Sequence, residues 1–251
     1  MPYLGYLLAQ AVKAGQTVAS AITSAASYVT KVGSSIVELS ASSEALKSPS
    51  AGSALFNGSG NYIIAADPNF SGSDSFTVGG WVYVNTPATN DGIILADETT
   101  GWGLQGIIIY SNYFYFYAGD NVGSTYSLVS SASGTLVEKT WIHVMATHTS
   151  SLNRIYINGN LSGSATAANL ASSPPNAFRL GTYGTYFDGN MANMAIWSRA
   201  LSAEEIRSVM MKSYDDLSAS ETKGLVSWYA LDDISGTTVP DSHGNFNGTG
   251  Y

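Results

Sequence analysis

The sequence predicts a mainly β protein, an antiparallel β-sandwich preceded by one long α-helix. From residue 54 onward, apolar and polar residues alternate in short runs that turn residues separate, which is the pattern of antiparallel strands. Before residue 48 the apolar residues are spaced by four and three residues in turn, which is the pattern of a helix with one apolar face. We therefore expect a helix at 1–47, a linker at 48–53 and a sandwich at 54–251.

Residues 1–47 carry an apolar seam with heptad spacing. It consists of Leu4, Leu8, Ala11, Gly15, Val18, Ile22, Ala25, Val29, Val32, Ile36 and Leu39. A coiled coil in water normally has charged residues beside its seam, whereas here the flanking residues are mostly Ala, Ser, Thr and Gln. This favours self-association or docking into a larger assembly. A single amphipathic helix packed against its own β domain is the alternative.

Ser, Pro and Gly are concentrated in the linker, and the heptad spacing is lost near Pro49. After it, 54–65 predicts a hairpin around Asn57-Gly58, a favoured turn dipeptide, and 106–119 predicts two strands around Ser111-Asn112. Further strands are expected at 75–84 and in WIHVMAT, RIYINGN and FRLGT. Ser202 and Glu205 have the spacing of a capping box, which predicts a short helix.

Four blocks of the sequence carry a family resemblance. They are SFTVGGWVYV at 75–84, WIHVMATHTSSLNRIYINGNLSGS at 141–164, FRLGTYGTYFDGNMANMAIWSRALSAEEIRSVM at 178–210, and GLVSWYALDDISGTTVPDSHGNFNGTG at 224–250. Together they resemble the laminin G-like branch of the concanavalin A-like lectin fold. The resemblance implies two curved antiparallel sheets packed as a jelly roll.

In that family, a block like 224–250 normally comes first, whereas here it comes last. One interpretation is that it begins a second, truncated repeat. Another is that 224–251 folds back and supplies the strand that is usually N-terminal, which we favour because natural sheets avoid long exposed edges. A third is that the strand is donated to a neighbouring subunit.

Charge excludes several classes of partner. The formal net charge is -8, with 10 Lys+Arg against 18 Asp+Glu, and no basic cluster of the kind that binds nucleic acid is present. The absence of cysteine excludes disulfides and thiolate metal sites. No stretch approaches the roughly 20 apolar residues that span a membrane. The first residues also lack the basic start of a signal peptide.

The acidic residues do not predict catalysis. Glycosidases of this general fold resemble one another in a strand of alternating carboxylates, which places an acid and a nucleophile about 5 Å apart on one face. Here the acidic residues occur as adjacent pairs such as Glu204-Glu205 and Asp232-Asp233, and neighbours on a strand point to opposite faces. His143 is expected to be a packed strand residue. We therefore predict a protein that is not an enzyme.

Calcium is the cofactor that the resemblance implies, since many relatives bind it at the rim of the sandwich. Asp241 and Asn245 form a turn rich in oxygen ligands, which calcium prefers, and Asp188 and Asp232 are additional candidate ligands. The pair Ala192-Asn193 stands where relatives frequently have Asp-Glu, which departs from the family pattern. A plain turn stabilised by the Asp side chain is the alternative.

Sugar binding is expected from aromatic residues in or beside the predicted turns, because aromatic faces stack on sugar rings. The candidates are Trp102, Tyr110, Tyr113, Tyr183 and Tyr186. Each of them also fits a place in the core or in a subunit contact.

The leading hypothesis is a non-enzymatic structural protein of a virion surface, such as a capsid decoration, head fibre or tail-fibre component of a bacteriophage. Its lectin-like domain would adhere to host-surface glycans, and the N-terminal helix would bind other copies or other virion proteins. This rests on architecture and analogy. The alternative is a secreted or cell-surface carbohydrate-binding module, dependent on calcium in one version. An atypical glycosidase is the third hypothesis.

Overall fold

The structure is a computed structural model of the whole chain. It describes residues 48, 51–66, 75–87, 91–97, 105–119, 126–167, 177–244 and 246–251. These all belong to one compact unit, Ala45–Tyr251. The helix expected at 1–47 lies outside the described residues, so the helix and the domain boundaries stay predictions.

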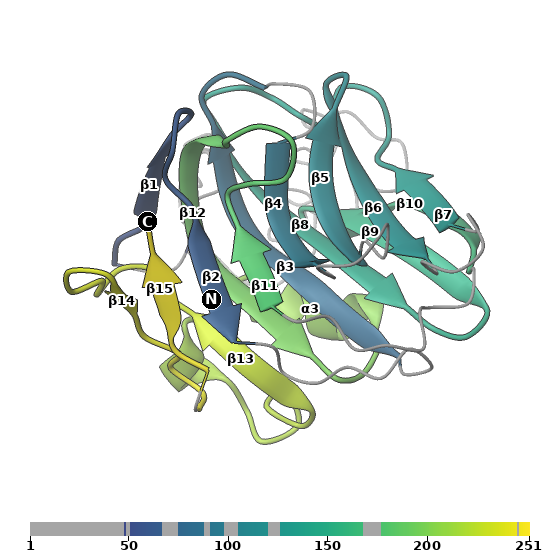
Figure 1. Cartoon of the computed structure of the whole chain (residues 1–251). Helices are drawn as coiled ribbons and strands as arrows, with labels where there is room; N and C mark the ends of the chain where they lie inside the picture. The colour runs from purple at the N-terminus through teal and green to yellow at the C-terminus, as the bar shows by residue number, and fades with distance from the viewer. Residues whose placement is uncertain are drawn as a thin grey trace, which may run out of the picture. The chain divides into compact units, whose positions relative to one another are not determined.

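Two antiparallel sheets form the sandwich (Figure 1). The seven-stranded β12 sheet has the order β1 (Ala54–Asn57), β12 (Asp188–Trp197), β3 (Phe76–Val84), β8 (Trp141–His148), β9 (Leu152–Ile157) and β10 (Asn160–Thr166), with β13 (Leu225–Tyr229) also paired to β12. The eight-stranded β4 sheet has the order β14 (Thr238–Val239), β15 (Gly248–Gly250), β2 (Ile63–Ala66), β11 (Ala177–Leu180), β4 (Asp91–Asp97), β5 (Gln105–Tyr110), β6 (Tyr113–Gly119) and β7 (Tyr126–Ser130). The predicted mainly β antiparallel sandwich is confirmed.

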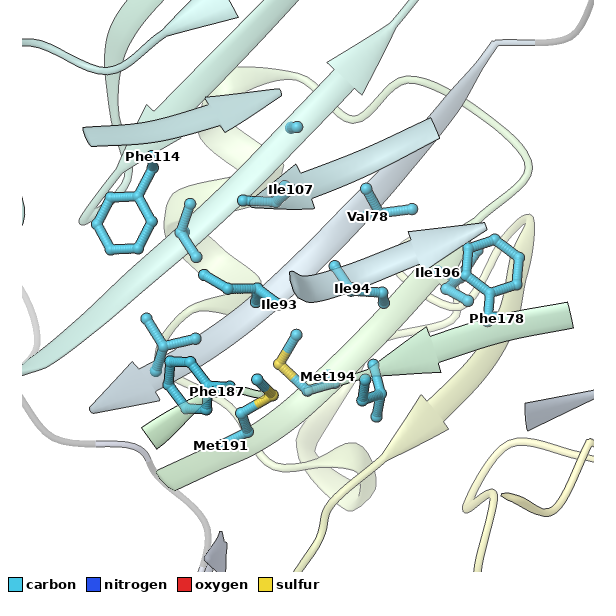
Figure 2. Packing of buried hydrophobic residues seen from close by; sticks show 14 of the residues in the cluster. Val78, Ile93, Ile94, Ile107, Phe114, Phe178, Phe187, Met191, Met194 and Ile196 are labelled. Atoms are coloured by element: carbon cyan, nitrogen blue, oxygen red, sulfur yellow. The ribbon is translucent and has the colours of Figure 1, made fainter. Parts of the chain in front are cut away.

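Apolar side chains from both sheets fill the space between them. In Figure 2, Met191 and Met194 of β12 lie close to Ile93 and Ile94 of β4, and Phe187 packs beside them. All five residues are fully buried. Removing a side chain of this size from water stabilises the fold by about 1.5–3 kcal/mol. The alternating pattern of the strands therefore produced the expected core.

A second apolar cluster covers the outer face of the β12 sheet. Ile206 and Val209 of helix α3 (Ala203–Val209) pack there with Trp197 and Trp228. The predicted capping box is confirmed, since Ser202 Oγ accepts from the Glu205 N–H and the Glu205 carboxylate accepts from the Ser202 N–H. A short 3-10 helix, η1 (Tyr214–Asp216), follows α3. Within the described ranges, no helix has the length and apolar character needed to cross a membrane.

The predicted hairpin at 54–65 is wrong. β1 pairs with β12 in one sheet, whereas β2 pairs with β11 and β15 in the other. The turn itself is present, because Asn57 Oδ1 accepts from the N–H groups of Ser59 and Asn61. Local turn chemistry fixes the bend but not the partner of the strand that follows, and here the bend carries the chain from one sheet to the other.

The hairpin predicted at 106–119 is confirmed as β5 and β6, which pair from Gln105 opposite Ala118 to Tyr110 opposite Tyr113. Ser111 and Asn112 both have positive φ, at 49° and 65°. That backbone conformation at both central residues belongs to the two-residue turn whose twist matches a hairpin.

The closing segment packs on the same sandwich in this structure. β13 pairs with β12, and β15 pairs with β2 in the opposite sheet. The Tyr229 hydroxyl, 2.5 Å from the Phe246 carbonyl oxygen, donates to it and ties β13 to the turn before β15. That β13 corresponds to the family's opening strand stays a prediction.

Candidate functional site

Several connections meet at one end of the β4 sheet. Ile63, the first residue of β2, lies opposite Leu180 and is paired with Gly250, the last residues of β11 and β15. Asp91, the first residue of β4, lies opposite Ile109 near the end of β5. The loops after β5, β11 and β15 therefore emerge beside the starts of β2 and β4. This end carries Tyr62, Tyr110, Tyr113, Tyr183, Tyr186 and Tyr251, which we call the tyrosine rim.

Tyr251, Tyr62 and Tyr186 form a continuous row of rings, the tyrosine row. The rings of Tyr62 and Tyr251 stack nearly parallel, with centroids 4.8 Å apart and planes at 8°. The Tyr186 ring continues the row at 6.2 Å from Tyr62. Tyr251 is 58% exposed and Tyr186 is 40% exposed. Both end residues of the row are thus accessible to solvent.

Backbone hydrogen bonds hold one end of the row. The Tyr251 N–H donates to the Tyr62 carbonyl oxygen at 2.9 Å, and the Tyr62 N–H donates to the Tyr251 carbonyl oxygen at 3.3 Å. The Asn61 side-chain amide also donates to the Tyr251 carbonyl oxygen, at 3.3 Å. Rings held in this way need little ordering when a ligand binds, which favours affinity.

The loop 181–187 holds the other end of the row. The Phe187 N–H donates to the Gly181 carbonyl oxygen at 2.9 Å, which closes the loop on itself. The Thr185 hydroxyl donates to Asp91 Oδ1 at 2.6 Å, and Asp91 is fully buried at the start of β4. A short hydrogen bond to a buried carboxylate is a strong one, so the loop that carries Tyr186 is firmly attached to the sheet.

Gly181→Ala is expected to lower the free energy of unfolding by about 2–3 kcal/mol, because an added Cβ overpacks the core. Gly181 has φ +84°, and its Cβ would lie 2.3 Å from the Phe56 ring. Gly236→Ala is the matched control, since Gly236 has φ +61° with nothing within 4 Å of the added Cβ. The control is expected to lose only about 1 kcal/mol, from backbone strain. Urea unfolding of both variants measures the difference, and equal losses would contradict the packing argument.

An uncharged cleft lies beside the tyrosine row at the edge of the sandwich. Its volume is about 340 Å³, and it lies between β1 of one sheet and β2, β14 and β15 of the other. Its walls include Leu55, Ile234, Val239, Asn61, Tyr62 and Tyr251, and none of the lining side chains is charged. The volume falls at the lower end of the roughly 300–1,000 Å³ range of small-molecule sites.

The predicted sugar-binding residues fall into two groups. Tyr110 and Tyr113 lie on the β5–β6 hairpin. Their ring centroids are 6.0 Å and 6.1 Å, respectively, from the ring centroid of Tyr115. Tyr183 and Tyr186 share the loop 181–187, and only Tyr186 belongs to the tyrosine row. Trp102 lies outside the described residues. Tyr62 and Tyr251 were missed in the sequence, where nothing marks them as neighbours.

The three predicted Asp ligands for calcium, Asp188, Asp232 and Asp241, do not form one cluster in the described part of the chain. Asp241 Oδ1 accepts from the N–H groups of Trp228 and His243, and its Oδ2 accepts from the Phe246 N–H. Asp188 Oδ1 accepts from the Asn85 amide, and Asp232 is exposed. Asn245 lies outside the described residues. Among those described, no group of three acidic, His or Cys side chains could hold a metal ion. These carboxylates do not fit as a calcium cluster, and calcium binding stays a prediction.

The acidic pair on α3 serves structural contacts. The Arg199 guanidinium forms an ion pair with Glu205 at 2.8 Å, and its hydrogen bond lowers the pKa of that carboxyl. Glu204 pairs with Arg207 at 2.7 Å. As expected, His143 is a packed strand residue, buried beside the Trp81 ring, and burial lowers its pKa to about 3. It is inaccessible to a substrate.

Solved structures of three proteins share this fold. A candidate carbohydrate-binding protein from Bacteroides ovatus ATCC 8483 matches with a TM-score of 0.60 and 20% identity, over 79% of this chain and 57% of that one. Domains LG4-5 of the mouse laminin alpha1 chain match with a TM-score of 0.50 and 13% identity, over 74% of this chain and 48% of that one. The heptameric SAP-like pentraxin of Limulus polyphemus matches with a TM-score of 0.51 and 14% identity, over 78% of this chain and 93% of that one. A search of curated proteins found no match.

The chain therefore spans a little over half the length of the Bacteroides protein and about half of the laminin chain. At these identities the likeness shows the fold. A family model gives the narrower result, since Laminin_G_3, described as concanavalin A-like lectin/glucanases superfamily, matches residues 57–207, more than half of the chain. With the sandwich and its sheet order, this match shows that the protein belongs to the laminin G branch of the concanavalin A-like lectin/glucanase superfamily.

Proposed function

We propose that the sandwich is a carbohydrate-binding domain that holds a neutral glycan on the tyrosine row. The observation that carries this is the alignment of Tyr251, Tyr62 and Tyr186 beside an uncharged cleft. Aromatic faces pack against the apolar faces of sugar rings, and nearby polar groups orient them. The net charge of -8 disfavours acidic glycans through repulsion. The similarity to the Bacteroides protein agrees with this function.

Tyr251→Ala is expected to weaken glycan binding by about five- to thirtyfold. The ring supplies the most exposed face of the row, and loss of one stacked aromatic ring is worth about 1–2 kcal/mol. The free energy of unfolding should fall by no more than about 1.5 kcal/mol, since the exposed side chain loses only its stacking on Tyr62. A glycan array identifies the ligand, and calorimetry then measures its affinity for both proteins.

Met211→Ala is a matched control, since Met211 is 60% exposed and follows α3, away from the tyrosine rim. It should bind as the wild type does. Equal affinity of the Tyr251→Ala variant and the wild type would exclude the tyrosine row as the binding surface.

The proposal extends to a non-enzymatic role on a virion surface, where the domain adheres to host glycans and the N-terminal segment joins copies or other virion proteins. The heptad spacing at 1–47 and the charged fraction of only 11% support it. Val18→Glu with Ile22→Glu, both in the seam, should convert an oligomer to monomers in light scattering. An unchanged mass would contradict assembly through this seam.

A secreted or cell-surface carbohydrate-binding module is the second candidate. It has the same tyrosine row and differs in its location. Mass spectrometry of the protein from its source separates the two, because it would find the chain either in purified particles or in the secreted fraction. In one version of this second candidate, glycan binding requires calcium. Glycan binding measured with and without chelator tests that requirement.

A further inference from the structure

The cleft beside the tyrosine row lies at the edge of the sandwich formed by β1 and β15. At the opposite edge, hydrogen bonds link the two sheets and the connection after β7. Ser127 Oγ donates to the Thr166 carbonyl oxygen at 2.8 Å, and Ser162 Oγ accepts from the Ala132 N–H at 2.8 Å. At the β1–β15 edge the structure has the cleft instead. A group attached to a sugar on Tyr251 can therefore reach apolar surface there.

The exposed walls of the cleft suit a small apolar group. Leu55 is 66% exposed and Ile234 is 39% exposed, and both line the cleft together with the buried Val239. A methyl group placed against such side chains gains a few-fold in affinity from burial. A carboxylate or sulfate in the same place would lose hydration and find no cation, because no lining side chain is positively charged.

Asn61 adds one directed polar group to this wall. Its Nδ2 donates to the Tyr251 carbonyl oxygen at 3.3 Å, which fixes the orientation of the amide. Its Oδ1 accepts no hydrogen bond within the described part of the chain. A side-chain carbonyl oxygen pairs well with an amide N–H of a ligand.

We infer that the cleft receives the acetamido group of a 2-acetamido sugar whose ring stacks on Tyr251. The methyl group packs against Leu55 and Ile234, and the acetamido N–H donates to Asn61 Oδ1. A plain hydroxyl at that position makes no use of the apolar wall, and a charged substituent is disfavoured. This inference rests on the proposed function and adds the class of sugar. One buried methyl and one hydrogen bond together predict a preference of about tenfold.

The test compares tri-N-acetylchitotriose with cellotriose, which have the same β-1,4-linked glucose backbone and differ in the group at carbon 2. Calorimetry with the full chain should give about tenfold tighter binding of the acetylated trisaccharide. Leu55→Ser should weaken the binding of tri-N-acetylchitotriose and leave that of cellotriose unchanged, so that the two affinities become similar. Leu161→Ser is the matched control, since Leu161 is also an exposed strand leucine, at 55%, on the opposite edge.

Ile234→Ser gives an independent second variant with the same expected result, in case Leu55→Ser alters folding. Equal affinities of the wild type for both trisaccharides would overturn the inference and leave the tyrosine row as a general glycan surface. An unchanged preference in both Ser variants would also overturn it. Failure to bind either trisaccharide would do the same, and the absence of any ligand on a glycan array would overturn the proposed function as well.

Discussion

Asp241→Ala is expected to lower the free energy of unfolding by about 3 kcal/mol or more. The carboxylate is buried, with 7% exposure, and accepts backbone N–H groups from Trp228 at 2.8 Å, His243 at 3.1 Å and Phe246 at 3.3 Å. Each buried donor left without a partner costs about 1–3 kcal/mol. These donors join β13 to the turn that leads to β15, so the variant loosens the whole closing segment from the two sheets.

Urea unfolding followed by tryptophan fluorescence measures the loss. Asp241→Asn keeps an acceptor at the Oδ1 position for Trp228 and His243, and places an NH2 group opposite the Phe246 N–H. Its loss should therefore be about half that of the alanine variant. Asp233→Ala, at an exposed position, is the control and should change stability by no more than about 0.5 kcal/mol. Equal stability of the Asp241→Ala and Asp233→Ala proteins would contradict the role of this carboxylate.

The same proteins separate the two interpretations of the 241–245 turn. If the Asp241 carboxylate only caps backbone N–H groups, calcium and chelator leave the midpoint of thermal unfolding unchanged in both wild type and variant. If calcium binds there, it raises the wild-type midpoint by mass action and fails to raise that of Asp241→Ala. The three N–H donors already use most of the lone-pair sites of this carboxylate, so we expect the first result.

Features that depend on neighbouring residues could be predicted from the sequence. The turn at Ser111-Asn112 and the capping box of Ser202 and Glu205 are set by local chemistry, and both are confirmed. The period of two along the strands fixes which side chains face the core, so the sandwich was predictable as well. The four family blocks also predicted two packed antiparallel sheets, because each block combines several such local features in the order typical of the family.

Features that depend on distant pairing could not be predicted. Asn57-Gly58 has hairpin chemistry, yet β1 and β2 enter different sheets, because each strand finds its partner in a distant part of the chain. The contact between Tyr62 and Tyr251 arises only once β15 pairs with β2. Tyr186 was predictable as a turn aromatic, but its membership of a row was not. The row became visible only when the edge strands were placed.

His143 gives the second large prediction, a loss of stability in mild acid. Burial lowers the pKa of its imidazole from 6.5 to about 3 in the folded protein. The unfolded chain therefore binds a proton between pH 6.5 and 3 that the folded chain does not. The free energy of unfolding should fall by up to about 1.4 kcal/mol per pH unit as the pH decreases through this window. Burial also lowers the pKa of His148, so this residue contributes to the loss of stability in the same direction.

Urea unfolding between pH 7 and pH 5 separates the contribution of the histidines from that of the carboxyls, which comes at lower pH. The pKa of Glu221 is lowered to about 2, so its stabilisation is lost only below its ordinary value of 4.5. His143→Gln removes the titrating group and should reduce the slope by about 1 kcal/mol per pH unit, although it is less stable at pH 7. Val144→Ala, at a fully buried neighbour, should lose stability equally at every pH and keep the wild-type slope. If His143→Gln and Val144→Ala gave parallel profiles, another group would have to account for the acid sensitivity. A reduced slope in His143→Gln alone would assign it to a histidine that is neutral in the core, serves packing beside Trp81, and limits the acidity in which the domain stays folded.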